Sequence, residues 1–197
     1  MNVSRETMAR LETYAALLKK WNPAINLVAK STLDDLWERH FEASAQVFDL
    51  CPDGASVWVD LGSGGGFPGM VVAILAAEAR PALKVTLVES DQRKATFLRT
   101  VARDCGVMVN VQAVRAETLA QQGADVVSAR ALAPLADLLA HADRHLRPGG
   151  SALLQKGAQA EAEIAEALAS WRFTVQRTPS KTDPRAVILM IGELARA

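Results

Sequence analysis

The hydrophobic pattern of the chain changes in character near residue 56. Before that point, apolar residues recur at helical spacing over residues 4–20, which predicts a first helix there. Asn22-Pro23 is expected to end this helix, because proline disfavours the α conformation in the residue before it. A second helix is predicted to begin after Ser31 or Thr32. The N-terminal quarter is therefore predicted to be helical.

From residue 56 onward, short apolar runs alternate with helical stretches. The apolar runs predict seven strands, at residues 56–61, 84–89, 107–113, 124–129, 151–155, 173–177 and 186–191. The stretches between them predict helices at residues 68–79, 92–105, 117–121, 135–146 and 158–170. This alternation is typical of a Rossmann-like α/β fold, whose mostly parallel sheet carries helices on both faces. The last two strands have no helix between them, so they should form a hairpin with an antiparallel strand at the sheet edge.

Composition supports this picture without adding a function. The 197 residues, half of them apolar, suit a single domain over residues 1–197, with a helical extension (1–50) and a core (56–197). The 22 basic and 22 acidic residues cancel, so net charge neither favours nor excludes nucleic acid. No apolar run approaches the roughly 20 residues of a membrane helix, and no signal-like segment is present. We expect a cytoplasmic protein with no membrane partner.

The two cysteines, Cys51 and Cys105, do not form a disulfide framework. We expect them to be buried as small apolar residues. Neither belongs to a CxxC pair or lies near a histidine at ligand spacing, so no metal site is expected.

The most informative segment is the glycine-rich run from Asp60 to Gly69. An apolar strand leads into G-x-G-x-G at Gly62 and Gly64, and Pro68 follows where a helix would begin. A ligand at such a turn lies over the carboxyl ends of the strands. Asp60 would repel a pyrophosphate but suits a cationic ligand, and S-adenosylmethionine carries an ammonium and a sulfonium. The pattern therefore favours S-adenosylmethionine over a dinucleotide.

Three further positions agree with a nucleoside cofactor. Glu89 ends the second predicted strand, where an acid can accept hydrogen bonds from both ribose hydroxyls, although NAD sites use the same device. Glu117, after the third strand, could contact the adenine or could simply be a carboxylate at a helix start. Arg130 ends the fourth strand, and a guanidinium at that depth needs partners. We interpret Arg130 as a contact of the cofactor or the substrate, with a structural ion pair as the alternative.

Motifs along nearly the whole chain resemble the RsmG family, also called glucose-inhibited division protein B. The matching segments, in order, are Trp21-Asn22, Ile25 to Val28, Arg39-His40-Phe41, Asp60 to Gly69, Glu89-Ser90, Phe97-Leu98, Ser128 to Ala131 and Gln155-Lys156-Gly157. The Gly-Phe-Pro-Gly and Ser-Ala-Arg-Ala pieces are far more specific than a bare G-x-G.

The resemblance implies methylation of N7 of guanine 527 in bacterial 16S rRNA, with S-adenosylmethionine as cofactor. The RNA would lie within the small ribosomal subunit or an assembly intermediate, and we expect a monomer. The cofactor contacts implied by position or by the strand ends are Gly62, Gly64, Phe67, Glu89, Ala116, Glu117 and Arg130. The RNA contacts implied are Arg93 (or Lys94), Arg115 and Lys156, although the family often has lysine at position 93.

Guanine N7 offers an in-plane lone pair and no proton, so the reaction needs positioning more than acid–base catalysis. We expect no catalytic nucleophile, and positioning by Arg130 and Lys156. No Asn/Asp-Pro-Pro-Tyr/Phe motif follows the fourth strand, and no Pro-Cys lies there, which disfavours exocyclic-amine and pyrimidine C5 methylation. Several basic residues of the core are expected to line one face around the pocket, whereas most of Arg99, Arg103 and Arg144 are expected on solvated helix faces. The candidates are Arg93, Lys94, Arg99, Arg103, Arg115, Arg144, Arg147 and Lys156.

Three other functions remain open from the residues alone. One is a small-molecule methyltransferase of the same fold, and a second is a nicotinamide-dependent oxidoreductase. The third is a non-catalytic RNA-binding protein, which the intact cofactor pattern disfavours.

Overall fold

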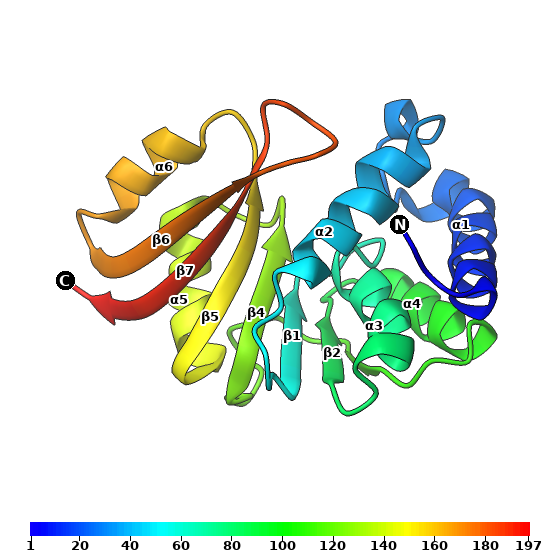
Figure 1. Cartoon of the computed structure of the whole chain (residues 1–197), viewed down its shortest axis with the longest axis horizontal. Helices are drawn as coiled ribbons and strands as arrows, with labels where there is room; N and C mark the ends of the chain where they lie inside the picture. The colour runs from blue at the N-terminus through cyan, green and yellow to red at the C-terminus, as the bar shows by residue number, and fades with distance from the viewer.

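The computed structural model describes residues 1–197 and contains a seven-stranded sheet in the order β3-β2-β1-β4-β5-β7-β6 (Figure 1). All pairings among β1 to β5 are parallel, and β7 is antiparallel to both its neighbours. The strands are β1 (Val57–Leu61), β2 (Lys84–Val88), β3 (Asn110–Gln112), β4 (Ala124–Arg130), β5 (Leu146–Lys156), β6 (Trp171–Pro179) and β7 (Val187–Arg196). The predicted mostly parallel sheet is confirmed.

Side chains alternate between two apolar cores, one on each face of the sheet. Trp58 and Val85 belong to the first core, which includes α3 (Gly69–Ala79) and α4 (Gln92–Asp104). Val59 and Val88 belong to the second core, which includes α5 (Leu135–His145) and α6 (Ala160–Ala167). Because the strands are covered on both faces, their burial is nearly continuous, as parallel sheets require.

The N-terminal helices extend the first core. They are α1 (Arg5–Ile25), the 3-10 turn η1 (Lys30–Thr32), the π-helical η2 (Trp37–Glu42) and α2 (Ala43–Asp49). Pro23 does not end α1 as predicted, and the helix continues to Ile25. Pro23 has no amide to donate to the preceding turn, and the helix ends soon after it, where Asn26 adopts the left-handed conformation at φ 50°. The second predicted helix is present but begins with the π-helical segment.

One other prediction was wrong in detail, and one was confirmed. Residues 117–121 form a turn rather than a helix, with the Thr118 amide bonded to the Arg115 carbonyl at 3.1 Å. The C-terminal hairpin forms as predicted and brings an antiparallel strand, β6, to the edge of the sheet, with β7 between β5 and β6. Burial explains this order, because Ile188, Leu189 and Ile191 of β7 are fully covered whereas β6 alternates buried and exposed residues.

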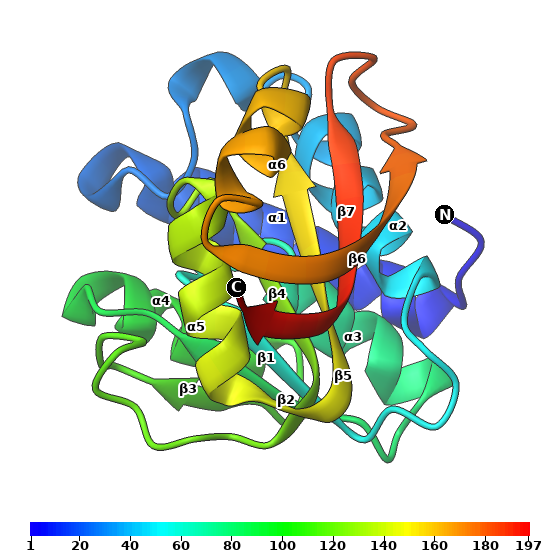
Figure 2. The ribbon, with the colours of Figure 1, turned by 90° about the vertical axis from the view of Figure 1, so that its left-hand side faces the viewer.

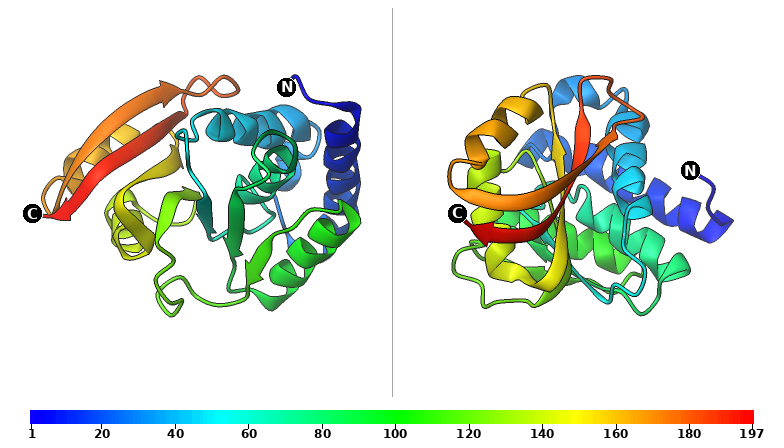
Figure 3. Two further views of the ribbon diagram at one scale, coloured as in Figure 1. Left: turned by 60° about the horizontal axis from the view of Figure 1, so that its bottom comes forward. Right: turned by 60° about the vertical axis from the view of Figure 1, so that its left-hand side comes forward.

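Figure 1 and the left view of Figure 3 show α1 and the β6–β7 hairpin at opposite ends of the molecule, with the sheet between them. Figure 2 shows this hairpin from its own side, next to α6. Both cysteines are buried and unpaired, as predicted. None of the helices combines the length and the apolar character needed to cross a lipid bilayer.

Candidate functional site

The glycine-rich loop between β1 and α3 is shaped by its neighbours as well as by its own flexibility. Gly66 has a φ of 100°, and a Cβ there would lie 2.4 Å from the Tyr14 hydroxyl oxygen. That hydroxyl donates a hydrogen bond to the Gly65 carbonyl. Gly62 has a φ of 64°, which also favours glycine. The first helix therefore fixes the loop, and side chains at these glycines would prevent its close approach.

All seven predicted cofactor residues line one cavity of about 490 Å³ at the carboxyl ends of β1, β2 and β4. They are Gly62, Gly64, Phe67, Glu89, Ala116, Glu117 and Arg130. The volume lies in the range of sites that bind a ligand of nucleoside size. The structure thus brings these residues together, and the contact of each with a cofactor stays a prediction.

Glu89 is the best-positioned acceptor in this cavity. Its side chain is buried, and its two oxygens accept the amides of Gly64 and Asp91 at 2.8 Å each. Each carboxylate oxygen has a second lone pair, so Glu89 can also accept hydrogen bonds from a ribose diol. A carboxylate held in this way from both sides of the cavity fits the nucleoside part of S-adenosylmethionine.

Asp60 lies beneath the loop and not in the cavity, contrary to its expected contact with a cationic ligand. It is fully buried and accepts a hydrogen bond from the Ser128 hydroxyl at 2.6 Å, while its Oδ2 has no hydrogen-bond donor. Burial raises the pKa of Asp60 to about 6, against the opposing effect of the Ser128 hydrogen bond. Its negative charge can act on the site only through space.

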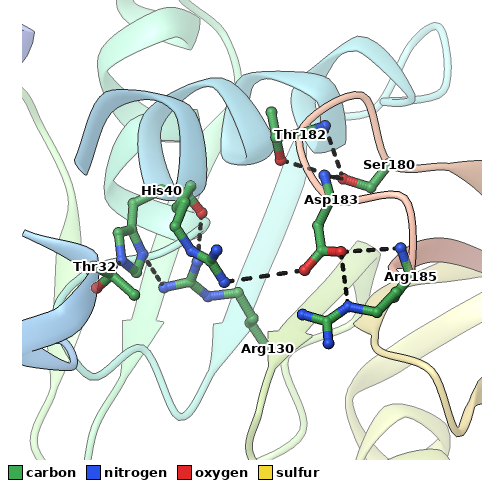
Figure 4. A network of polar contacts seen from close by, with 8 residues as sticks. Thr32, His40, Arg130, Ser180, Thr182, Asp183 and Arg185 are labelled. Carbon is green, nitrogen blue, oxygen red and sulfur yellow. Dashed lines mark hydrogen bonds and ion pairs between the residues drawn. The ribbon is translucent and has the colours of Figure 1, made fainter. Parts of the chain in front are cut away.

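Arg130 leaves β4 between two cavities and has no carboxylate partner within 4.0 Å (Figure 4). Its guanidinium donates to His40 Nδ1 at 2.8 Å and to the Arg39 carbonyl at 3.4 Å, and lies 5.1 Å from the centre of the Phe67 ring. The predicted alternative of a structural ion pair is therefore wrong. A buried cation held by neutral groups keeps its charge available for a ligand, although burial lowers the pKa of Arg130.

His40 fixes the direction of the Arg130 side chain. Burial and the nearby charge of Arg130 lower the pKa of His40 to about 3, so its ring is neutral near pH 7. Because Nδ1 accepts from Arg130, the ring proton is on Nε2, which faces the Thr32 hydroxyl at 2.8 Å. The Thr32 hydroxyl in turn donates to the Ala29 carbonyl at 2.7 Å. This network connects the segment before α2 to the site.

The predicted RNA-binding residues occupy different places. Arg115 is exposed and lines the first cavity together with Lys94, whereas Arg93 is exposed outside it and pairs with Asp91 at 3.3 Å. The Lys156 side chain is only 8% exposed, forms an ion pair with Glu163 at 2.5 Å and donates to the Ala133 carbonyl at 3.1 Å. Its geometry therefore suits positioning of the loop after β4.

The expected basic face is only partly formed. Arg99 and Arg144 donate to backbone carbonyls and Arg103 pairs with its neighbour Asp104, so these three belong to exposed helix surfaces. Arg147 lies at the opposite end of the sheet, on Asp125. Of the eight basic residues considered, those lining the two cavities are Lys94, Arg115 and Lys156.

A second cavity of about 350 Å³ adjoins the first and shares Arg130 and Ala131 with it. It extends towards Arg39 and the β6–β7 loop. Sequence reasoning gave no role to Tyr14, His40 or the β6–β7 loop. The Arg39-His40-Phe41 motif was the one available signal, because a histidine in an otherwise apolar helix has to find a polar partner.

Comparison with known proteins gives a consistent result. The family model described as rRNA small subunit methyltransferase G matches residues 7–188. Ribosomal RNA small subunit methyltransferase G of Rhodospirillum centenum is 56% identical over 98% of this chain and 87% of its own length. The protein of that name from Ruegeria sp. is 51% identical over 100% of this chain and 95% of its own.

Solved structures match the fold at much lower identity. A methyltransferase from Geobacter sulfurreducens is 16% identical, with a TM-score of 0.63 over 98% of this chain and 92% of its own. At that identity the likeness concerns the arrangement of strands and helices. It agrees with a Rossmann-like methyltransferase sheet.

Proposed function

Since the chain belongs to the rRNA small subunit methyltransferase G family, we propose that it transfers a methyl group from S-adenosylmethionine to N7 of guanine 527 in 16S rRNA. The observation that supports this most directly is the gathering of all seven predicted cofactor residues around one cavity. The substrate would be the small ribosomal subunit or an assembly intermediate, met in the cytoplasm. The enzyme would act as a monomer, with residues 1–50 and 56–197 forming one working unit.

When bound, S-adenosylmethionine supplies a methyl group on a positively charged sulfur. Glu89 would accept hydrogen bonds from its ribose, and the Gly62–Gly64 backbone would lie against its amino-acid part. Phe67 and Arg130 form the wall where the methyl group has to meet the base. No residue has to remove a proton, because the N7 lone pair is free, so the chain's contribution is positioning and exclusion of water.

The site residues differ in what they offer to the RNA. Arg115 is exposed at the mouth of the first cavity and suits a phosphate contact. Arg93 lies further out and would add a longer-range attraction. Lys156 would hold the loop after β4, through the Ala133 carbonyl, against the incoming nucleotide. Arg130 would act as the central positioning residue.

Methyl transfer assays on purified substrates test the proposal. Small subunits from cells that lack the protein would accept one methyl group per particle, and mapping would place it at N7 of guanine 527. Naked 16S rRNA and metabolite extracts serve as the other substrates. Labelling of metabolites alone would contradict the proposal and favour a small-molecule methyltransferase.

A further inference from the structure

The second cavity has a different chemical character from the first. Its walls come from η2, from the ends of β4 and β5 and from the β6–β7 loop. Both cavities have charged side chains in their walls, but the first is also lined by the glycine loop and by large apolar side chains, whereas the second has no apolar side chain larger than alanine. Two carboxylates face it, Glu163 and Asp183. Glu163 is already engaged by Lys156 at 2.5 Å and by the Leu135 amide at 2.7 Å.

Asp183 is held in place by an ordered loop. Gln46 of α2 donates to the Pro179 carbonyl at 2.8 Å and accepts the Lys181 amide at 2.9 Å, which fastens the loop to the N-terminal helices. The Ser180 hydroxyl accepts the Asp183 amide at 3.2 Å. A loop with these anchors can present a side chain in a defined direction (Figure 4).

One oxygen of Asp183 is free to receive a ligand. Oδ1 accepts the Arg185 amide at 2.9 Å and forms an ion pair with Arg185 Nε at 3.5 Å. Oδ2 lies 4.0 Å from the Arg39 guanidinium, too far for a hydrogen bond. Gln155 contributes a second unsatisfied acceptor to this region, because its Oε1 is buried without a donor. The cavity therefore offers acceptors on the side away from the cofactor.

We propose that the second cavity holds the target guanine and that Asp183, next to Arg39, recognises its Watson–Crick edge. This inference rests on the proposed function. Guanine presents an acceptor, O6, beside two donors, N1–H and the N2 amine. Arg39 can donate to O6, and Asp183 beside it can accept from the N1–H and N2 donors, so the pair complements that edge. Adenine would direct the lone pair of its N1 at the carboxylate, which is repulsive, so the pair selects guanine.

The same placement aims N7 at the cofactor. In a purine, N7 lies on the side away from the N1 and N2 donors. Asp183 lines the second cavity but not the first, whereas Arg130 and Ala131 line both cavities. A guanine anchored at Asp183 therefore turns N7 towards the shared wall. The new bond joins the methyl carbon to N7 as the carbon–sulfur bond breaks, and the base becomes positively charged. The Asp183 carboxylate stabilises that charge.

Replacing the N2 amine tests this directly. Small subunits would be assembled from ligated 16S rRNA that carries either guanosine or inosine at the target position. Inosine keeps O6, N1–H and N7 and lacks only the N2 amine. Initial rates of methyl transfer would be measured for the unaltered protein and for the variants Asp183→Asn and Asp143→Asn. Asp143 is exposed on α5 and lines neither of the two cavities, so it is the matched control.

We expect the unaltered protein and Asp143→Asn to prefer guanosine over inosine by about 10- to 100-fold in kcat/KM. In Asp183→Asn, kcat/KM on guanosine should fall by about the same factor, whereas kcat/KM on inosine should fall only slightly. Its affinity for S-adenosylhomocysteine, measured by calorimetry, should be unchanged, because Asp183 does not line the first cavity. A normal guanosine preference in Asp183→Asn would overturn the inference.

Equal rates on both substrates with the unaltered protein would overturn it as well, whatever the variants do. Failure of the proposed function has a different signature. In that case the unaltered protein would transfer no methyl group to the guanosine particle, although it binds S-adenosylhomocysteine.

Discussion

Two buried aspartates, one at the amino end of a strand and one at the carboxyl end of its neighbour, show that the two ends of the strands have different hydrogen bonding. Asp125, at the amino end of β4, accepts the amides of Ser56 and Val57, the Ser56 hydroxyl and the Arg147 guanidinium. Asp60, near the carboxyl end of β1, accepts one short side-chain hydrogen bond, from Ser128, while Ser63 and the Gly69 amide act on it more weakly and its Oδ2 has no well-placed donor. The carboxylate at the amino end, away from the site, has all its hydrogen-bond partners, whereas the carboxylate at the carboxyl end, near the site, does not.

The pKa values of the two carboxyls follow from this difference. Burial alone would raise the pKa of Asp125, but the Ser56 and Val57 amides and Arg147 outweigh it and lower the value to about 2. At Asp60 burial dominates and raises the pKa to about 6. Arg130, at the same end of the sheet, is likewise a buried charged group that lacks an ion-pair partner within 4.0 Å and donates to His40 instead. The amino end of β4 therefore holds a fully bonded carboxylate, whereas the carboxyl ends of β1 and β4, beside the two cavities, hold buried charged groups with fewer partners.

The largest expected effect is on stability, at Asp125 and the amino end of β4. Asp125→Ala leaves the Ser56 and Val57 amides and the Arg147 guanidinium without their acceptor, which should cost about 3 kcal/mol in the free energy of unfolding. Urea unfolding measures it. The methyl transfer rate per folded molecule should stay within about twofold, because Asp125 lies far from both cavities. A large loss of rate in the folded variant would break the comparison.

The next largest effect is on methyl transfer activity, at Arg130 and the carboxyl end of β4. Arg130→Met removes the cation shared by the two cavities, and we expect kcat/KM to fall about 100-fold, equivalent to about 2.7 kcal/mol. The midpoint of thermal unfolding should not fall, because the variant also removes a buried charge with no carboxylate partner. Arg147→Met is the matched control and should keep its methyl transfer activity while losing stability. The comparison fails if both variants lose activity equally.

The two aspartates should give pH effects of opposite sign on the free energy of unfolding, of about 2 to 3 kcal/mol each. The lowered pKa of Asp125 stabilises the fold above about pH 4, and this is lost as the pH falls towards 2. The raised pKa of Asp60 destabilises the ionised fold, a cost that appears as the pH rises from about 4 to 6 and is complete above that.

Unfolding free energies of the unaltered protein, Asp60→Asn and Asp125→Asn between pH 2 and 7 separate these terms. Relative to the unaltered protein, Asp60→Asn should gain stability as the pH rises from about 4 to 7. Asp125→Asn should lose stability as the pH rises from about 2 to 4. Parallel curves for the two variants would contradict the assigned pKa values.

The smallest effect concerns the support of the glycine loop. Tyr14→Phe removes the hydrogen bond to the Gly65 carbonyl and keeps the ring packed on Phe67 at 5.3 Å. We expect a loss of about 1 kcal/mol in stability and a several-fold weaker binding of S-adenosylhomocysteine, measured by calorimetry. Thr13→Val is the control, because the half-buried Thr13 hydroxyl donates to the Ala9 carbonyl of its own helix, and it should leave cofactor binding unchanged. Equal binding by both variants would show that α1 does not shape the loop.

The local parts of the fold followed from the sequence. Short apolar runs predicted the strands, because a strand covered on both faces has to be apolar along its length. The glycine run and Glu89 predicted the first cavity, because the carboxyl ends of parallel strands meet at one edge. The errors arose where tertiary context outweighs local preference, as at Pro23, which lies inside α1, and at residues 117–121, where a turn replaces the predicted helix.

The sequence by itself determined the class of fold, the residues that line the first cavity and the family. Each depends on residues close in the chain or on the ends of adjacent strands, and such signals are local. Only the tertiary structure decided how the charged groups are balanced. Arg130 meets His40 from ninety residues away, and Gln46 fastens the loop that carries Asp183. Burial and long-range contacts set these partnerships, so no pattern of neighbouring residues could have predicted the second cavity.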